Sequence, residues 1–187
     1  MFDFQLRRAT RHDFATLIRL IHALLGEMYA LSSKALTDQG EAWQDFETRI
    51  LQTLNCEEHG EYAYPCTTDH LLELADLIGG EVLSIGLIEA SILPPTPIFR
   101  PLRTLHIHAV YVLPRYRRRG VGTALLRAAL DWGQPQGCCQ AQLSVLPRNP
   151  ARRLYQELGF NVNGLEMRKE MTGVNGPRDL VHTNCGK

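Results

Sequence analysis

The segment Val112-Leu113-Pro114-Arg115-Tyr116-Arg117-Arg118-Arg119-Gly120-Val121-Gly122 joins two elements that the sequence itself predicts. Before it, Leu105 to Val112 is apolar and rich in β-branched residues, as in a buried strand, and after it Gly120 to Trp132 has apolar residues at helical spacing. A helix amino terminus exposes unpaired N–H groups and carries about half a positive charge. Glycines there let an anion approach the backbone, and arginines add positive charge. The segment therefore predicts an anion cradle suited to a diphosphate.

Familiar phosphate-binding motifs of different design fit this segment less well. It lacks the Gly-Lys-Ser/Thr of a P-loop and the third glycine of the dinucleotide fingerprint. A basic turn before a glycine-tolerant helix is one alternative, and a nucleic-acid patch is another, because Arg115 to Arg119 is a basic run. Few aromatic residues beyond Tyr111 and Tyr116 lie nearby, and the net charge is zero. We therefore expect no nucleic-acid partner.

Hydrophobic periodicity predicts the remaining elements. Phe4 to Arg8 alternates as a strand, and Thr10 and Asp13 have the spacing of a capping box before an amphipathic helix reaching Met28. Further predicted elements are a helix with apolar residues Trp43, Phe46, Ile50 and Leu54, strands at 71–75, 82–93, 140–146 and 165–171, and a helix from Asn149-Pro150 to Gly159. Alternating strands and helices in the second half predict a mostly parallel or mixed sheet with helices on both faces.

Length and composition suit one domain, which we place at residues 1–171, followed by a flexible tail at 172–187. The five cysteines are odd in number, so we expect a reducing compartment. We find no apolar signal region and no run near the roughly 18 apolar residues that span a membrane. The expected localisation is cytoplasmic, without a membrane partner, and the oligomeric state is left open, a homodimer included.

Two segments resemble the GNAT superfamily of N-acetyltransferases. Residues 112–122 match its central motif, a strand ending in Val-x-Pro followed by Arg/Gln-x-x-Gly-x-Gly/Ala, and Ala151 to Phe160 is similar to its Ala-x-x-Leu-Tyr-x-x-x-Gly-Phe motif. The resemblance implies an α/β fold with a mixed, mostly antiparallel sheet and helices on both faces. It also implies an acyltransferase that moves an acetyl group from acetyl-CoA, its co-substrate, directly to a primary amine. Arg148 stands where the family often has Asn, and Asn149 follows it.

The resemblance also implies which residues bind acetyl-CoA and assist the reaction. Backbone N–H groups around Val110, Tyr111 and Val112 would stabilise the thioester oxygen, and Tyr155 would protonate the departing thiolate. The other cofactor-binding residues would be Arg117, Arg118, Arg119, Gly120, Val121, Gly122, Thr123 and Asn149. Two alternatives are structural: Tyr155 as an aromatic on a buried helix face, and Asn149 as a helix cap.

The candidate general bases are His106 and His108, which would share one strand face with Val110 and Val112 by the period of two. Histone-acetylating members of the family place a Glu at the position matching His106. Either histidine could take the proton of the ammonium directly or through water. The alternatives are structural histidines, Glu89 on the preceding strand, or ordered water alone.

The acceptor is the least explicit feature of the sequence. Residues 1–93 hold fifteen Asp/Glu against six Lys/Arg, which hints at a cationic amine of a small molecule or a protein. The acidic residues concerned are Glu41, Asp45, Glu47, Glu57, Glu58 and Glu61. The spacings of Cys56, His59, Cys66 and His70 would permit zinc, but their order matches no familiar finger and we expect no metal. The competing function is a catalytically inactive acetyl-CoA-binding sensor or interaction module.

Overall fold

The computed structural model describes residues 2–31, 50, 54, 69–79, 82–93 and 103–164. Several predicted features lie outside these residues: most of the second helix, Cys56, His59 and Cys66, the acidic residues between 41 and 61, the last strand at 165–171 and the tail at 172–187. Ile50 and Leu54 are helical and buried, as the predicted second helix requires. The domain boundary at residue 171 stays a prediction.

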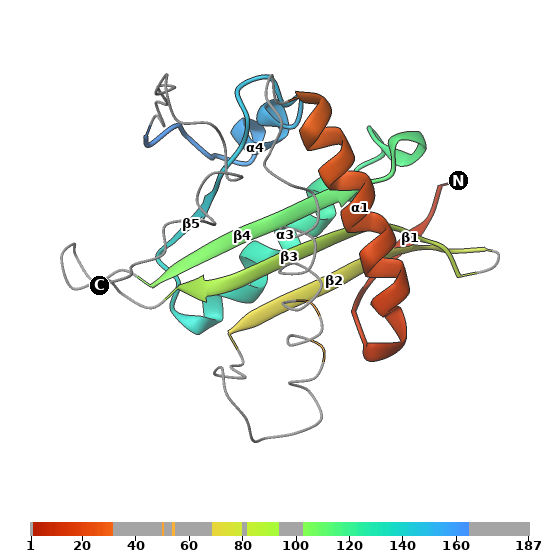
Figure 1. The fold of residues 1–187 in the computed structure, drawn as a ribbon. Coiled ribbons are helices and arrows are strands. Elements are labelled where there is room, and N and C mark those ends of the chain that lie inside the picture. The colour runs from red at the N-terminus through yellow and green to blue at the C-terminus, as the bar shows by residue number, and fades with distance from the viewer. Residues whose placement is uncertain are drawn as a thin grey trace, which may run out of the picture.

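One five-stranded sheet, in the order β1-β2-β3-β4-β5, organises the described chain (Figure 1). Its strands are β1 (Phe4–Arg8), β2 (His70–Leu77), β3 (Ser84–Leu93), β4 (Thr104–Val112) and β5 (Gln140–Leu143). The first four are antiparallel neighbours, and only β5 pairs in parallel, with β4. This confirms the mixed, mostly antiparallel sheet that the resemblance implies, and the alternative of a mostly parallel sheet was wrong. The parallel pair β4–β5 is joined through α3, the kind of crossover that parallel pairing needs.

Helices cover both faces of the sheet, as predicted: α1 (Phe14–Leu31) lies on one face and α3 (Val121–Gly133) on the other (Figure 1). Short 3₁₀ turns occur at Arg11–Asp13, Pro114–Tyr116 and Gln134–Gln136, and α4 (Arg152–Glu157) follows β5. The two sides have separate cores. Leu17, Leu20 and Ile21 fill the α1 side, and Leu125 and Leu126 fill the α3 side.

The segment Arg11–Leu31 is long and apolar enough to cross a membrane by length and composition, contrary to the expectation that no run approaches that limit. The core helix of a globular domain passes the same test. In this structure Leu17, Leu20 and Ile21 are fully buried against the sheet. These three residues of α1 are therefore used for packing within the fold.

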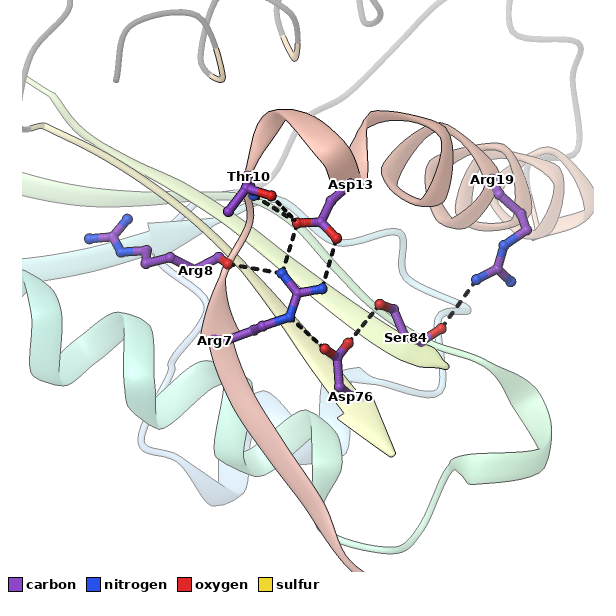
Figure 2. Close-up of polar contacts among 7 residues, drawn as sticks. All are labelled: Arg7, Arg8, Thr10, Asp13, Arg19, Asp76 and Ser84. Carbon is purple, nitrogen blue, oxygen red and sulfur yellow. Dashed lines mark hydrogen bonds and ion pairs between the residues drawn. The ribbon is translucent and has the colours of Figure 1, made fainter. Parts of the chain in front are cut away.

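A charged network fixes the start of α1 to the sheet (Figure 2). The Arg7 guanidinium donates two 2.7 Å hydrogen bonds to the Asp13 carboxylate and a third, from Nε, to buried Asp76. Ser84 donates to the other Asp76 oxygen at 2.6 Å, and the Thr10 backbone N–H donates to Asp13 at 2.8 Å. The Thr10–Asp13 capping interaction was predicted, but the partner of Asp13 on β1 was not.

Candidate active site

The pairing of β4 with β5 stops before β4 ends. Parallel partners run from Thr104↔Gln140 to Ile107↔Leu143, whereas β4 continues to Val112. β5 is correspondingly shorter than the strand predicted at 140–146. The edge of β4 that faces away from β3, from residue 108 to 112, is therefore left without a described strand beside it. An extended ligand could lie along this edge as an added strand would.

A β-bulge lies where the two strands separate. Glu89 is paired with Ala109 and the next residue, Ala90, with Ile107, so His108 is an extra residue in β4. A bulge of this kind reverses the alternation of side chains beyond it. Ile107 accordingly packs in the α3 core, whereas Ala109 packs in the α1 core.

The bulge contradicts the prediction that the two histidines share a face with Val110 and Val112. Both valines pack against the α3 core. His106 precedes Ile107 and faces the α1 side, and the His108 ring is stacked on it with centroids 4.5 Å apart. The period of two failed here because it assumes continuous pairing, and His108 interrupts the pairing.

The histidine pair lies among polar side chains from both neighbouring strands. His108 Nε2 is 2.7 Å from Ser91 Oγ on β3, and the Gln142 amide of β5 donates to His106 Nδ1 at 3.4 Å. Ser91 and Glu89 are buried, and both face the α1 side with the histidines. The pair is thus oriented from both sides by the sheet, while His108 remains exposed.

The backbone of the predicted anion cradle is a tight turn that leads into α3. Arg118 has a φ of 61° and Gly120 a φ of 85°, two left-handed residues in the turn that enters α3. Gly120 is the N-cap and makes no side-chain cap, and the Ala124 N–H is bonded to the Gly120 carbonyl at 2.9 Å. The N–H groups of residues 121–123 therefore precede the helical hydrogen bonds, as an anion site requires.

The arginine side chains of this loop do not converge. Arg117 reaches the α1 side, where its guanidinium contacts Glu27 at 2.7 Å, although α3 lies on the opposite face. Arg119 lies over the Phe2 ring at 4.8 Å, and Arg115 lies over Tyr116 at 4.8 Å. The sequence predicted that the guanidinium groups of Arg117, Arg118 and Arg119 lie beside the cradle, whereas those of Arg117 and Arg119 contact different neighbours.

Gly122 has a packing role that the sequence did not reveal. A Cβ at this position would lie 3.2 Å from Leu154 Cδ2, so the missing side chain allows α4 to pack on α3. Asn149 acts as the predicted structural alternative: its Oδ1 accepts the Ala151 N–H at 2.8 Å and caps the turn before α4. The close packing at Gly122 and the cap by Asn149 are both explained by contacts within the protein, without a bound ligand.

Tyr155 projects from α4 into the α3 core, edge-on to Phe160 with ring centroids 6.1 Å apart. Burial raises the pKa of its phenol above the ordinary value of 10. The phenol therefore remains protonated and can act as a proton donor. Both predicted roles, buried aromatic and proton donor to a thiolate, are compatible with this placement.

Sequence reasoning missed Glu27, Ser91 and Gln142. Glu27 had one signal, an acidic residue in the otherwise apolar carboxyl-terminal half of α1. Ser91 and Gln142 had none, because their importance depends on register with β4. Among the described residues no group of three or more His, Cys, Asp or Glu could hold a metal ion. Three of the four residues considered for zinc, Cys56, His59 and Cys66, lie outside the described residues.

Comparison with known proteins agrees with this architecture. The Acetyltransferase (GNAT) family model matches residues 29–160. Aminoglycoside N(6')-acetyltransferase type 1 of Salmonella typhimurium is 29% identical over 100 residues, 49% of this chain and 63% of that protein. Thialysine N-epsilon-acetyltransferase of Mus musculus is 36% identical over 58 residues, 30% of this chain and 34% of that protein. The chain thus spans less than two thirds of these curated relatives.

A solved structure shares the fold at low identity. AAC(6')-Iy, in complex with the bisubstrate analog CoA-S-monomethyl-acetylneamine, has a TM-score of 0.62 and 19% identity, covering 90% of this chain and 98% of that chain. The family match extends over more than half of the chain and includes the cradle, the histidine pair and Tyr155. This chain belongs to the GNAT family of acetyltransferases.

Proposed function

We propose that this protein transfers an acetyl group from acetyl-CoA to a primary amine by direct attack. One observation carries the proposal: β4 separates from β5 after Ile107, and its open edge leads to the cradle at the start of α3. The open edge suits an extended amide-containing arm, and the cradle suits a diphosphate. Coenzyme A has these two parts in this order.

The residues present fit the donor. Backbone groups of Val110, Tyr111 and Val112 lie on the open edge, and the N–H groups of Val121, Gly122 and Thr123 point from the start of α3. Acetyl-CoA, when bound, supplies an acetyl group activated as a thioester. A backbone N–H of β4 would stabilise the negative charge that builds on the thioester oxygen.

We assign the two proton transfers, from the ammonium and to the thiolate, to opposite faces of the sheet. His106 and His108 on the α1 side would accept the proton that the ammonium must lose before its nitrogen attacks. Tyr155 on the α3 side would donate a proton to sulfur as the carbon–sulfur bond breaks. In this proposal attack and departure occur on opposite faces of the sheet, without an enzyme-bound acetyl group.

The acceptor that we propose is a cationic primary amine. The named substrates of two relatives, aminoglycosides and thialysine, are amines. On the α1 side, where attack would occur, the described chain carries the buried carboxylate of Glu89, whereas that of Glu27 is paired with Arg117. Carboxylates near the site favour a cation over a neutral substrate.

Thiol release measured with acetyl-CoA and a panel of amines tests the proposal. The panel pairs each primary amine with its N-dimethyl analogue, whose nitrogen would have no N–H to lose after acylation and so cannot give a stable amide. We expect thiol release with primary amines alone and an acetylated product by mass spectrometry. Binding of CoA without turnover on any amine would favour the inactive sensor, and no binding of CoA would exclude both.

A further inference from the structure

Arg117 joins the end of β4 and the cradle loop to α1, which is ninety residues away in the sequence. Its Nε donates to the Val112 carbonyl at 2.8 Å, and its Nη2 donates to both Glu27 oxygens at 2.7 and 2.8 Å. The Tyr111 hydroxyl donates to the same Glu27 carboxylate at 3.0 Å, and the guanidinium lies 5.4 Å from the Tyr111 ring centroid. These contacts connect the carboxyl-terminal half of α1, the end of β4 and the first residue of the cradle loop.

Arg117 stands directly before the turn that leads into α3, so its contacts bear on the shape of that turn. The next residue, Arg118, is in the left-handed region, which a residue with a Cβ adopts only when its surroundings hold it there. Arg117 is the fixed point on one side of that turn, and the buried Val121 is the fixed point on the other. The turn between them determines where the N–H groups of residues 121–123 point.

We propose that Arg117 is a positioning residue: it holds the cradle loop in its binding conformation through Glu27 and Val112, and it does not itself bind phosphate. The inference rests on the proposed acetyl-CoA site. Three observations on the Arg117 side chain support the positioning role. The guanidinium lies on the α1 side, its Nε and Nη2 are already bonded within the protein, and Tyr111 fixes the carboxylate that receives it.

Changing Glu27 separates this role from direct phosphate binding, because the two roles predict opposite effects. If Arg117 bound phosphate, Glu27 would compete with the phosphate, and Glu27→Gln would strengthen CoA binding. If Arg117 positions the loop, Glu27→Gln releases it, and the binding conformation becomes a smaller fraction of the population. Affinity falls by the same fraction, roughly threefold to tenfold.

Isothermal titration of CoA into the wild type, Glu27→Gln, Arg117→Gln and the double variant makes the test. We expect both single variants to bind more weakly and the double variant to bind no more weakly than the worse single variant, because both changes remove one interaction. The salt dependence of CoA binding should be the same for Arg117→Gln as for the wild type. Glu157→Gln is the matched control, because Glu157 pairs with Arg153 at 3.0 Å on exposed α4.

Each other outcome has a definite meaning. Stronger or unchanged CoA binding by Glu27→Gln, or a shallower salt dependence for Arg117→Gln, would overturn the positioning role. A wild type that does not bind CoA would overturn the proposed function instead. Amide hydrogen exchange at residues 118–123 without ligand provides a second test: we expect faster exchange in Glu27→Gln than in Glu157→Gln, and equal rates would contradict the proposal. Both carboxylates are exposed enough that neither change should unfold the protein.

Discussion

The imidazole rings of His106 and His108 are stacked 4.5 Å apart, with their planes 9° from parallel, on the α1 side of the sheet. Ser91 and Gln142 hold the two rings from opposite sides. The two rings are therefore held together as one unit.

Replacing the histidines tests this directly. We expect His106→Ala and His108→Ala together to lower kcat at saturating amine by about 10²-fold to 10⁴-fold, the usual contribution of general base catalysis. If the pair acts as a unit, the worse single variant loses nearly as much as the double variant. Ser91→Ala should lower kcat less and leave CoA binding unchanged. Equal rates for the double variant and the wild type would show that neither histidine is the base.

Tyr155→Phe tests the proton donor on the other side of the sheet. The change removes only the hydroxyl, so the edge contact with Phe160 and the stability of the fold should persist. We expect kcat to fall by about 10²-fold while CoA binds with unchanged affinity. Because burial raises the pKa of Tyr155, its phenol should not limit the wild-type rate up to about pH 10. Tyr116→Phe is the control, and a kcat equal to that of the wild type in Tyr155→Phe would refute the role.

Local patterns predicted most of the elements, because each depends on neighbours in the chain. The strand at Phe4–Arg8, the Thr10–Asp13 cap and the strand–cradle–helix unit around Gly120 all depend on spacings of a few residues. Capping and amphipathic packing need no distant partner to be recognised.

The features that sequence reasoning missed depend on distant partners. The bulge at His108 is defined only by its register against Glu89 and Ala90, and it moved two candidate bases to the other face. Arg117 was assigned to the phosphate by its place in a motif, but Glu27, ninety residues away, determines where its side chain lies. Side-chain direction in a basic loop follows such contacts, which no spacing along the chain encodes.

The Arg7–Asp13 pair makes stability depend on acid pH. Hydrogen bonds from Arg7 and Thr10 lower the pKa of Asp13 to about 2, from about 3.9 in an unfolded chain. A group with a lowered folded pKa stabilises the fold above its unfolded pKa and loses that contribution as pH falls. We expect a loss of up to about 2 kcal/mol between about pH 4 and pH 2.

Urea denaturation at a series of pH values measures this contribution. Asp13→Asn should be less stable than the wild type at pH 7, and the difference should shrink toward pH 2, where the wild-type carboxyl also gains a proton. Asp131→Asn, on the exposed side of α3, is the control and should run parallel to the wild type. A difference between Asp13→Asn and the wild type that stayed constant from pH 7 to pH 2 would contradict the assignment.

Three glycines should respond differently to alanine because their surroundings differ. At Gly86 a Cβ would lie 2.8 Å from the Tyr111 carbonyl oxygen, a backbone atom held in place by the pairing of β3 with β4. We therefore expect Gly86→Ala to lower the free energy of unfolding by about 1–3 kcal/mol. At Gly122 the Cβ would meet only the end of Leu154, and Gly122→Ala should be partly rescued by Leu154→Ala. At Gly26, inside α1, nothing lies within 4 Å, and alanine should stabilise the helix by about 1 kcal/mol. Thermal denaturation of Gly86→Ala, Gly122→Ala, Gly26→Ala and the double variant Gly122→Ala/Leu154→Ala checks this order of stability. A Gly86→Ala variant as stable as the wild type would show that β3 and β4 are not packed this closely.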